Sequence, residues 1–155
     1  MGYKNVYGFD ASNSGINLAK NRFPQIAKNF FVHNAYEVQL PSNMPQKYDL
    51  IISMEVIEHL LYPKMYLKNI NDWLKNEGYL ILTTPYHGYF KNLLIALLNK
   101  FDHHVNPLWE GGHIKFFSKR TISKLLNQTG FKLMNFIGCG RIPYIWKSMV
   151  ILAQK

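Results

Sequence analysis

The chain has 155 residues, of which 48% are hydrophobic and 15% aromatic, so it can form one core at the usual size of one domain. Its single cysteine, Cys139, excludes an intrachain disulfide and any zinc site built from several cysteines, and no stretch approaches the roughly 20 apolar residues of a membrane span. These features predict a soluble, cytoplasmic protein without a transmembrane segment. The formal charge of +9 favours acidic partners, but the basic residues are scattered, which favours a generally solvated basic surface over a dedicated nucleic-acid-binding stripe.

The first third of the chain is predicted to form a strand, a helix and a second strand. Residues 5–9 are β-prone and are followed by Asp10 and a cluster of Ser, Asn and Gly, which indicates a strand that turns into a helix. Apolar residues then recur at helical spacing up to a proline: Ile16, Ala19 and Phe23. Residues 30–33 are a second candidate strand.

The middle of the chain contains the most strongly predicted strand. Residues 49–53 form a continuous apolar run after an acidic residue, a pattern typical of a strand buried on both faces of a parallel sheet. A helix with an apolar stripe is predicted from Pro63 to before Gly78. Residues 79–83 form the next buried strand.

Ser118 can cap the last helix at its amino end, and Gly130 suits its carboxyl-terminal cap. Residues 132–137 and 149–153 are two final strands, expected to form an antiparallel pair. The pattern predicts one Rossmann-like α/β domain over residues 1–155, with three layers, a mostly parallel sheet and a carboxyl-terminal antiparallel hairpin.

In such sheets ligands bind beyond the carboxyl ends of the strands, so the residues that follow each strand are the candidates for function. Asp10 closes an early strand, where a carboxylate can accept hydrogen bonds from both hydroxyls of a ribose. The alternative is that Asp10 caps the following helix, and spacing alone leaves both readings open.

Four blocks of the chain occur in an order that resembles one known family. They are 8–12 (Gly-Phe-Asp-Ala-Ser), 48–59 (Tyr-Asp-Leu-Ile-Ile-Ser-Met-Glu-Val-Ile-Glu-His), 78–85 (Gly-Tyr-Leu-Ile-Leu-Thr-Thr-Pro) and 113–118 (His-Ile-Lys-Phe-Phe-Ser). In this order the chain resembles class I S-adenosylmethionine-dependent methyltransferases of types 11 and 23, the group that includes ubiquinone-biosynthesis O-methyltransferases and many enzymes that methylate sugars or lipids. The resemblance extends from Tyr3 onward.

The resemblance implies a set of residues that bind S-adenosyl-L-methionine. Asp10 would bind the ribose, Ala11 and Ser12 would lie near the adenine, and Asn34 with Ala35 would contact the adenine edge at a position where the family often has Asp. Ser53, Met54 and Glu55 would line the boundary between cofactor and substrate, although Met54 could equally be a packing residue.

A hydroxyl acceptor must lose a proton during methyl transfer, and histidine is the side chain suited to accept it near neutral pH. His59 closes the Glu-Val-Ile-Glu-His block and is the predicted catalytic residue, with a role in orienting a turn as the alternative. His87 and His113 lie near other strand or loop ends and are predicted to face the substrate. His103, His104 and His113 lack companion cysteines and helical i, i+4 spacing, so no metal site is predicted.

Residues 90–109 include Leu93, Leu94, Leu97 and Leu98 at helical spacing between Lys91 and Lys100. This segment could cover the substrate pocket or rest on a membrane surface. A lid helix that packs on the domain is the preferred prediction, because an interfacial helix usually has a more strongly basic polar face.

Class I methyltransferases begin with a strand and a glycine-rich loop that hold the methionine end of the cofactor, and only nine residues precede Asp10. The chain is therefore expected to be an incomplete domain that lacks its first strand. Self-association through the open sheet position would be one consequence. The predicted function is methyl transfer to a small-molecule acceptor, on an oxygen of a sugar, quinone or lipid-linked compound. The alternatives are a non-catalytic interaction module or inactive fragment and, third, a nucleic-acid methyltransferase.

Overall fold

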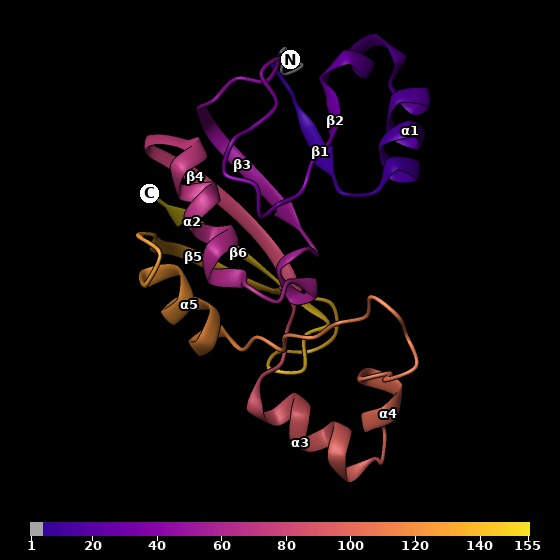
Figure 1. Ribbon diagram of the computed structural model, residues 1–155. Coiled ribbons are helices and arrows are strands. Elements are labelled where there is room, and N and C mark those ends of the chain that lie inside the picture. The colour runs from indigo at the N-terminus through magenta and orange to yellow at the C-terminus, as the bar shows by residue number, and fades with distance from the viewer. Residues whose placement is uncertain (1–4) are drawn as a thin grey trace. The chain divides into compact units, whose positions relative to one another are not determined.

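The computed structural model describes residues 5–155, which divide into two compact units, residues 5–47 and Tyr48–Lys155. Each unit is described by itself (Figure 1). Both combine strands with helices, and the strand pairs are parallel in the first unit and mixed in the second. The predicted α/β class, with parallel strands and an antiparallel carboxyl-terminal part, is confirmed.

The first unit is a two-stranded parallel sheet with one long helix. Strand β1 (Gly8–Asp10) pairs with β2 (Phe30–Val32), and α1 (Asn13–Arg22) connects them together with a short 3-10 helix (Pro24–Asn29). The backbone N–H of His33 donates to the carbonyl of Asp10 at 3.1 Å, so the two strands end at the same edge. The predicted elements are all present, although β1 starts at Gly8.

The second unit contains a four-stranded sheet in the order β3-β4-β6-β5. The strands are β3 (Tyr48–Met54), β4 (Leu74–Pro85), β5 (Lys132–Cys139) and β6 (Ser148–Gln154). The first pair is parallel, while β6 runs antiparallel to both of its neighbours. The carboxyl-terminal strands therefore form the predicted antiparallel pair, and β6 inserts between β4 and β5.

Two helices of the second unit begin where the sequence predicts, and the first of them ends earlier than predicted, because Leu74 already belongs to β4. Helix α2 (Pro63–Trp73) starts at its proline and contacts β4. Helix α5 (Lys119–Asn127) has Ser118 and Thr121 in a reciprocal capping box and contacts β5. Gly130 follows with a φ of 84°, the left-handed conformation that a helix carboxyl cap requires. The core of this unit consists of fully buried aliphatic side chains: Ile57, Leu67, Leu74, Leu80, Leu82, Ile122, Leu126 and Ile151.

Strand β3 is not buried on both faces, contrary to the prediction. Ser53 is buried toward α2, where its Oγ accepts a hydrogen bond from Tyr66. Successive side chains of a strand point to opposite faces, so Leu50, Ile52 and Met54 point the other way, and all three are exposed. Strand β4 also begins earlier than predicted, at Leu74, because a register shift near its start allows pairing of Leu74 with Tyr48.

The segment after β4 differs most from its prediction. It forms α3 (Tyr89–Leu97) and the short α4 (Phe101–His104), but its leucines do not pack on the domain. Leu97 is 74% exposed, whereas Ile95 and Lys91 are the buried residues of α3. The prediction that the leucines of this helix pack on the domain is therefore wrong. The opposite face of α3 is buried instead, because the Lys91 ammonium points inward and donates to the carbonyls of Tyr86 and Lys147. In the part of the chain that the structure describes, no helix is long and apolar enough to cross a membrane.

Candidate functional site

The predicted ribose-binding residue lies at the end of β1 in the first unit. Asp10 is exposed, and its Oδ1 accepts a hydrogen bond from the backbone N–H of Ser12 at 2.7 Å. Ser12 is the residue that caps α1, because its own Oγ accepts from the N–H of Gly15 at 3.1 Å. Asp10 therefore does not cap the helix. It closes a turn with one carboxylate oxygen, and Ala11 lies in the same exposed turn.

Asn34 and Ala35 follow β2 at the same edge of this small sheet as Asp10. Asn34 is exposed, and its Oδ1 accepts a hydrogen bond from the N–H of Tyr36 at 3.0 Å. Two polar side chains thus follow the carboxyl ends of two paired parallel strands, which is where such sheets bind ligands. The structure brings these predicted cofactor residues together, and an exposed carboxylate beside an amide suits a nucleoside with its hydroxyl and amine donors.

In the second unit, the end of β3 turns sharply. Glu55 has a φ of 51°, in the left-handed region that few residues other than glycine adopt. Its N–H donates to the carbonyl and the Oγ1 of Thr83, both at 3.1 Å, and its Oε1 accepts from Ser148 at 3.1 Å. Ser53 is buried just before this turn, whereas Met54 is 67% exposed and does not pack in the core. Contacts from β4 and β6 hold the strained turn.

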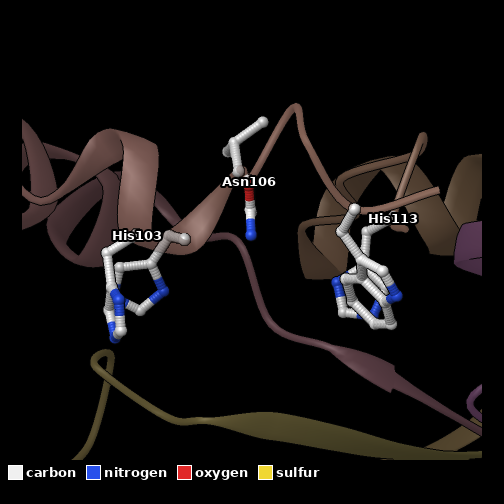
Figure 2. A pocket seen from close by; sticks show the side chains of 6 residues that line it. His103, Asn106 and His113 are labelled. Carbon is white, nitrogen blue, oxygen red and sulfur yellow. The ribbon is translucent and has the colours of Figure 1, made fainter.

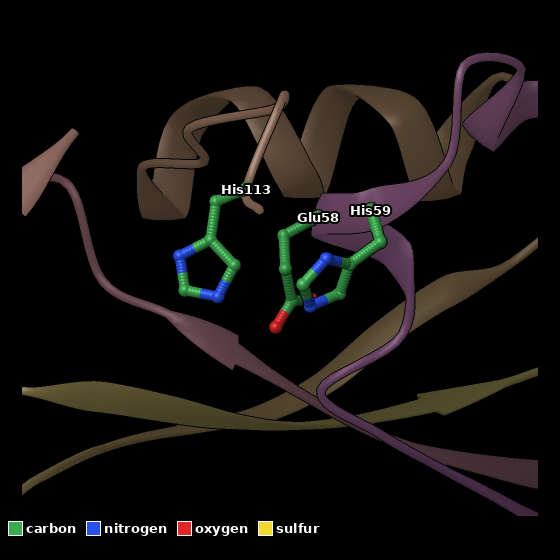
Figure 3. Close-up of side chains that lie close together, drawn as sticks. All are labelled: Glu58, His59 and His113. Carbon is green, nitrogen blue, oxygen red and sulfur yellow. The ribbon is translucent and has the colours of Figure 1, made fainter. Parts of the chain in front are cut away.

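A cluster of three side chains forms next to this turn: Glu58, His59 and His113 (Figure 3). Each offers one ligand atom, and these atoms all lie within 4.8 Å of one another. The first two residues belong to the short 3-10 helix η2 (Ile57–His59), and His113 comes from a loop more than fifty positions later. The rings of His59 and His113 meet edge to face, with centroids 4.8 Å apart. We call these three residues the Glu58 cluster.

Glu58 is a fully buried carboxylate with one hydrogen-bonded oxygen. Thr84 Oγ1 donates to its Oε2 at 3.0 Å. Its Oε1 is buried and has no hydrogen-bond partner within residues 5–155. Burial raises the pKa of Glu58 above its ordinary value, although its hydrogen bonds act in the opposite direction. A buried carboxylate oxygen without a donor is costly, and it suits a group that receives a proton or a cation.

His59 is oriented by the loop that carries His113. Its Nδ1 lies 2.8 Å from the carbonyl oxygen of Gly111 and 3.2 Å from that of Gly112. A carbonyl only accepts, so in the neutral tautomer Nδ1 carries the hydrogen and Nε2 keeps its lone pair. His59 therefore presents a proton acceptor or metal ligand at its outer nitrogen. Two imidazoles with one carboxylate are also donors that can hold a divalent transition-metal ion.

Backbone hydrogen bonds fix His113 beside Glu58. The carbonyl of Glu58 accepts from the N–H groups of Ile114 and Lys115, both at 2.9 Å. Burial lowers the pKa of His113, and the neighbouring His59 lowers it further. His113 also lines a cavity of about 300 Å³ together with His103, His104, Val105, Asn106 and Trp109 (Figure 2). One residue is thus shared by the Glu58 cluster and the cavity.

His87, predicted to face the substrate, is not part of the Glu58 cluster. Its ring packs edge to face on Phe116 with centroids 4.9 Å apart, and Asn92 lies 3.4 Å from its Nδ1. Burial and the charge of Lys91 lower the pKa of His87 to about 4, so it is neutral near pH 7.

Sequence reasoning did not assign a role to Glu58 or Thr84. Glu58 stands in the Glu-Val-Ile-Glu-His block, so the block itself was the available signal. No sequence signal pointed to Thr84, because its contact with Glu58 joins positions that are 26 residues apart.

Helices that cover strands, with polar residues after the carboxyl ends of parallel strands, are typical of Rossmann-like α/β proteins. The family model described as "Methyltransferase domain" matches residues 1–135. The chain belongs to this family of class I methyltransferases.

Individual relatives agree with this assignment. The chain is 27% identical over 135 residues to the ubiquinone biosynthesis O-methyltransferase of Coxiella burnetii, an alignment that covers 86% of this chain and 56% of that protein. The chain thus spans about half the length of the curated relatives that it matches.

Solved structures share the fold at low sequence identity. A SAM-dependent methyltransferase of Methanosarcina mazei has a TM-score of 0.69 and 20% identity, with 97% of this chain and 81% of that one covered. The magnesium protoporphyrin IX methyltransferase of Synechocystis, with bound SAH, has a TM-score of 0.63 and 20% identity, with 97% of this chain and 63% of that one covered. An N-methyltransferase of Bradyrhizobium japonicum, in complex with S-adenosyl-L-homocysteine, has a TM-score of 0.66 and 14% identity, with 97% of this chain and 66% of that one covered.

Proposed function

We propose that this chain forms part of an enzyme that transfers a methyl group from S-adenosyl-L-methionine to an oxygen of a small-molecule acceptor, a sugar, quinone or lipid-linked compound. The observation that carries the oxygen assignment is the Glu58 cluster, which offers a proton acceptor beside a cavity. An attacking hydroxyl has to lose a proton, whereas the sulfonium itself supplies the leaving group. The relative from Coxiella burnetii carries the name of an O-methyltransferase, which supports the same class of acceptor.

The residues at the end of β1 and β2 suit the nucleoside end of the cofactor. Asp10 is exposed, and a carboxylate has more acceptor positions than the one that Oδ1 uses for the Ser12 N–H, so it can also accept from ribose hydroxyls. Asn34 follows the neighbouring strand at the same edge. The role of these residues, with Ala11, Ser12 and Ala35 beside them, is to bind and orient the cofactor, and Ser53, Met54 and Glu55 are assigned to the boundary with the acceptor.

The acceptor is assigned to the cavity beside His113 (Figure 2). His59 then receives the hydroxyl proton at Nε2 while Nδ1 donates to the Gly111 carbonyl. Glu58, one residue away and buried, stabilises the imidazolium that forms. His87 contributes to the acceptor side as a neutral side chain.

The test is calorimetric titration of the protein with S-adenosylhomocysteine, followed by a screen of hydroxylated acceptors with radiolabelled cofactor. Binding should be lost in Asp10→Ala and retained in Asp49→Ala, a matched control whose carboxylate pairs with Lys75 on the surface. Methyl transfer to a phenol, sugar or lipid-linked hydroxyl would support the proposal. Transfer to RNA or DNA, or a folded protein that binds no cofactor and self-associates, would contradict it.

The screen should be run with added Mn²⁺ and, in parallel, with a chelator. Activity that is independent of both supports direct proton transfer to His59. Activity that requires the ion would instead assign the Glu58 cluster to cation binding, for which its two imidazoles and one carboxylate are suitable donors.

A further inference from the structure

Thr84 is a fully buried threonine at the carboxyl end of β4, and the proposed chemistry does not use its side chain. A buried hydroxyl requires a hydrogen-bond partner, and the partner here is the carboxylate of Glu58, at 3.0 Å. This contact is notable because Glu58 is itself completely buried and its other oxygen has no hydrogen-bond partner among residues 5–155.

An ionised carboxylate has no hydrogen to donate, so the hydroxyl is the donor of this contact. Thr84 Oγ1 donates to Oε2, which restrains the carboxylate and leaves Oε1 without a hydrogen-bond partner among residues 5–155. One carboxylate oxygen of Glu58 belongs to the set in which the ligand atoms of Glu58, His59 and His113 lie within 4.8 Å of one another. Figure 3 shows the Glu58 carboxylate lying alongside the two rings.

Residues next to Thr84 tie the other glutamate of the Glu-Val-Ile-Glu-His block, Glu55, to the same strand. Thr83 accepts the N–H of Glu55 on its carbonyl and its hydroxyl. Ser148 Oγ lies 3.0 Å from the Thr84 carbonyl and 3.1 Å from Glu55 Oε1, so its single hydrogen is shared between these acceptors. Two adjacent threonines of β4 therefore hold both glutamates of the Glu-Val-Ile-Glu-His block.

We infer that Thr84 is a positioning residue that orients the Glu58 carboxylate toward His59 and His113. This inference rests on the proposed function for its catalytic consequence, but the orientation itself does not depend on it. Among residues 5–155, Thr84 is the only side chain that donates a hydrogen bond to the Glu58 carboxylate. Without its hydroxyl, the carboxylate could rotate about χ3, a torsion angle with a broad distribution in glutamate. The geometry of the whole cluster would then relax.

The experiment compares Thr84→Val, which keeps the shape and removes the hydroxyl, with Thr84→Ser, which restores it. Thr129→Val is the matched control, because Thr129 is also buried and its hydroxyl donates to the carbonyls of Leu125 and Leu126 on α5. Nuclear magnetic resonance of the histidine rings, at one fixed pH, reports on the orientation of the Glu58 carboxylate, because a nearby carboxylate changes the chemical shifts of the rings. The ring signals of His59 and His113 should shift in Thr84→Val, return in Thr84→Ser and stay unchanged in Thr129→Val.

Turnover gives the second readout. With an acceptor in hand, kcat of Thr84→Val should fall about 10- to 100-fold, because small displacements of reacting groups are costly, while KM for the cofactor stays within about twofold. Unchanged ring signals in Thr84→Val would overturn the inference. If the wild-type protein methylates no acceptor, the proposed function fails, but the ring signals still decide the positioning role. If Thr84→Val does not fold, Thr84→Cys, with a weaker donor, should give the same shifts at smaller amplitude.

Discussion

The hydroxyl of Tyr66 on α2 donates a hydrogen bond of 2.9 Å to the Oγ of Ser53 on β3, in the interior of the second unit. Both residues are buried, and burial raises the pKa of Tyr66 to about 12. This contact joins the helix to the strand directly before the Glu55 turn, so it supports one of the residues assigned to the cofactor boundary.

Replacement of Tyr66 by Phe should lower the free energy of unfolding by about 1 to 3 kcal/mol, because the Ser53 hydroxyl stays buried without its donor. Urea denaturation at pH 7 measures this change. Tyr79→Phe is the control, since that tyrosine is 40% exposed and only accepts a long contact from Gln154, and it should stay within about 0.5 kcal/mol. Equal losses in the two variants would show that the buried hydrogen bond contributes no extra stability.

Replacement of His59 by Asn should separate the roles of its two ring nitrogens. The Asn amide can still donate to the Gly111 carbonyl in place of Nδ1, so the loop stays held, but the acceptor at Nε2 is lost. We expect kcat to fall about 100-fold or more and S-adenosylhomocysteine affinity to stay within about twofold. Unchanged kcat at saturating acceptor would remove His59 from the proton transfer.

The pH dependence of stability should reveal His87. Its pKa in the folded protein is about 4, below the ordinary 6.5, so between these values the unfolded chain binds more protons. The wild type therefore loses stability as pH falls from 6.5 to 4, and His87→Asn should lose less, by about 1 kcal/mol after allowance for partial exposure of the ring. Chemical denaturation at pH 7 and pH 4.5 measures both proteins. Parallel pH dependence in the two would contradict the depressed pKa.

Helix α3 offers a matched pair that tests which of its faces packs. Ile95 is 7% exposed and Leu97 is 74% exposed, although they are only two positions apart. Ile95→Ala should cost about 2 to 4 kcal/mol of unfolding free energy, because it leaves a cavity, and Leu97→Ala less than about 0.5 kcal/mol. Thermal or urea unfolding distinguishes them. A large loss in Leu97→Ala would mean that the leucine face is covered in solution.

Helix α5 shows why local patterns were read correctly. A serine that can accept the N–H three residues later and a glycine that tolerates positive φ mark the ends of the helix without help from distant residues. The same holds for α2, which begins at Pro63. Strand β3 was misread on one face, because a run of apolar residues does not say what covers each side. The leucines of α3 were misread for the same reason.

The strand ends point to Asp10 and Asn34 in the first unit and to Glu55 in the second, and their role in cofactor binding stays a prediction. The pairing of His59 with His113 could not be read, since their approach depends on hydrogen bonds from a loop to the Glu58 carbonyl.

The sequence by itself determined the class of the fold and the family, and it predicted the strand ends at which a ligand would bind, since these follow from short-range periodicity, capping and the order of recognisable blocks. Only the tertiary structure decided which polar groups meet. The Glu58 cluster joins a 3-10 helix to a distant loop, and the hydroxyl that orients Glu58 comes from β4. The directions of buried hydrogen bonds depend on how strands and loops pack, and spacing along the chain does not encode that packing.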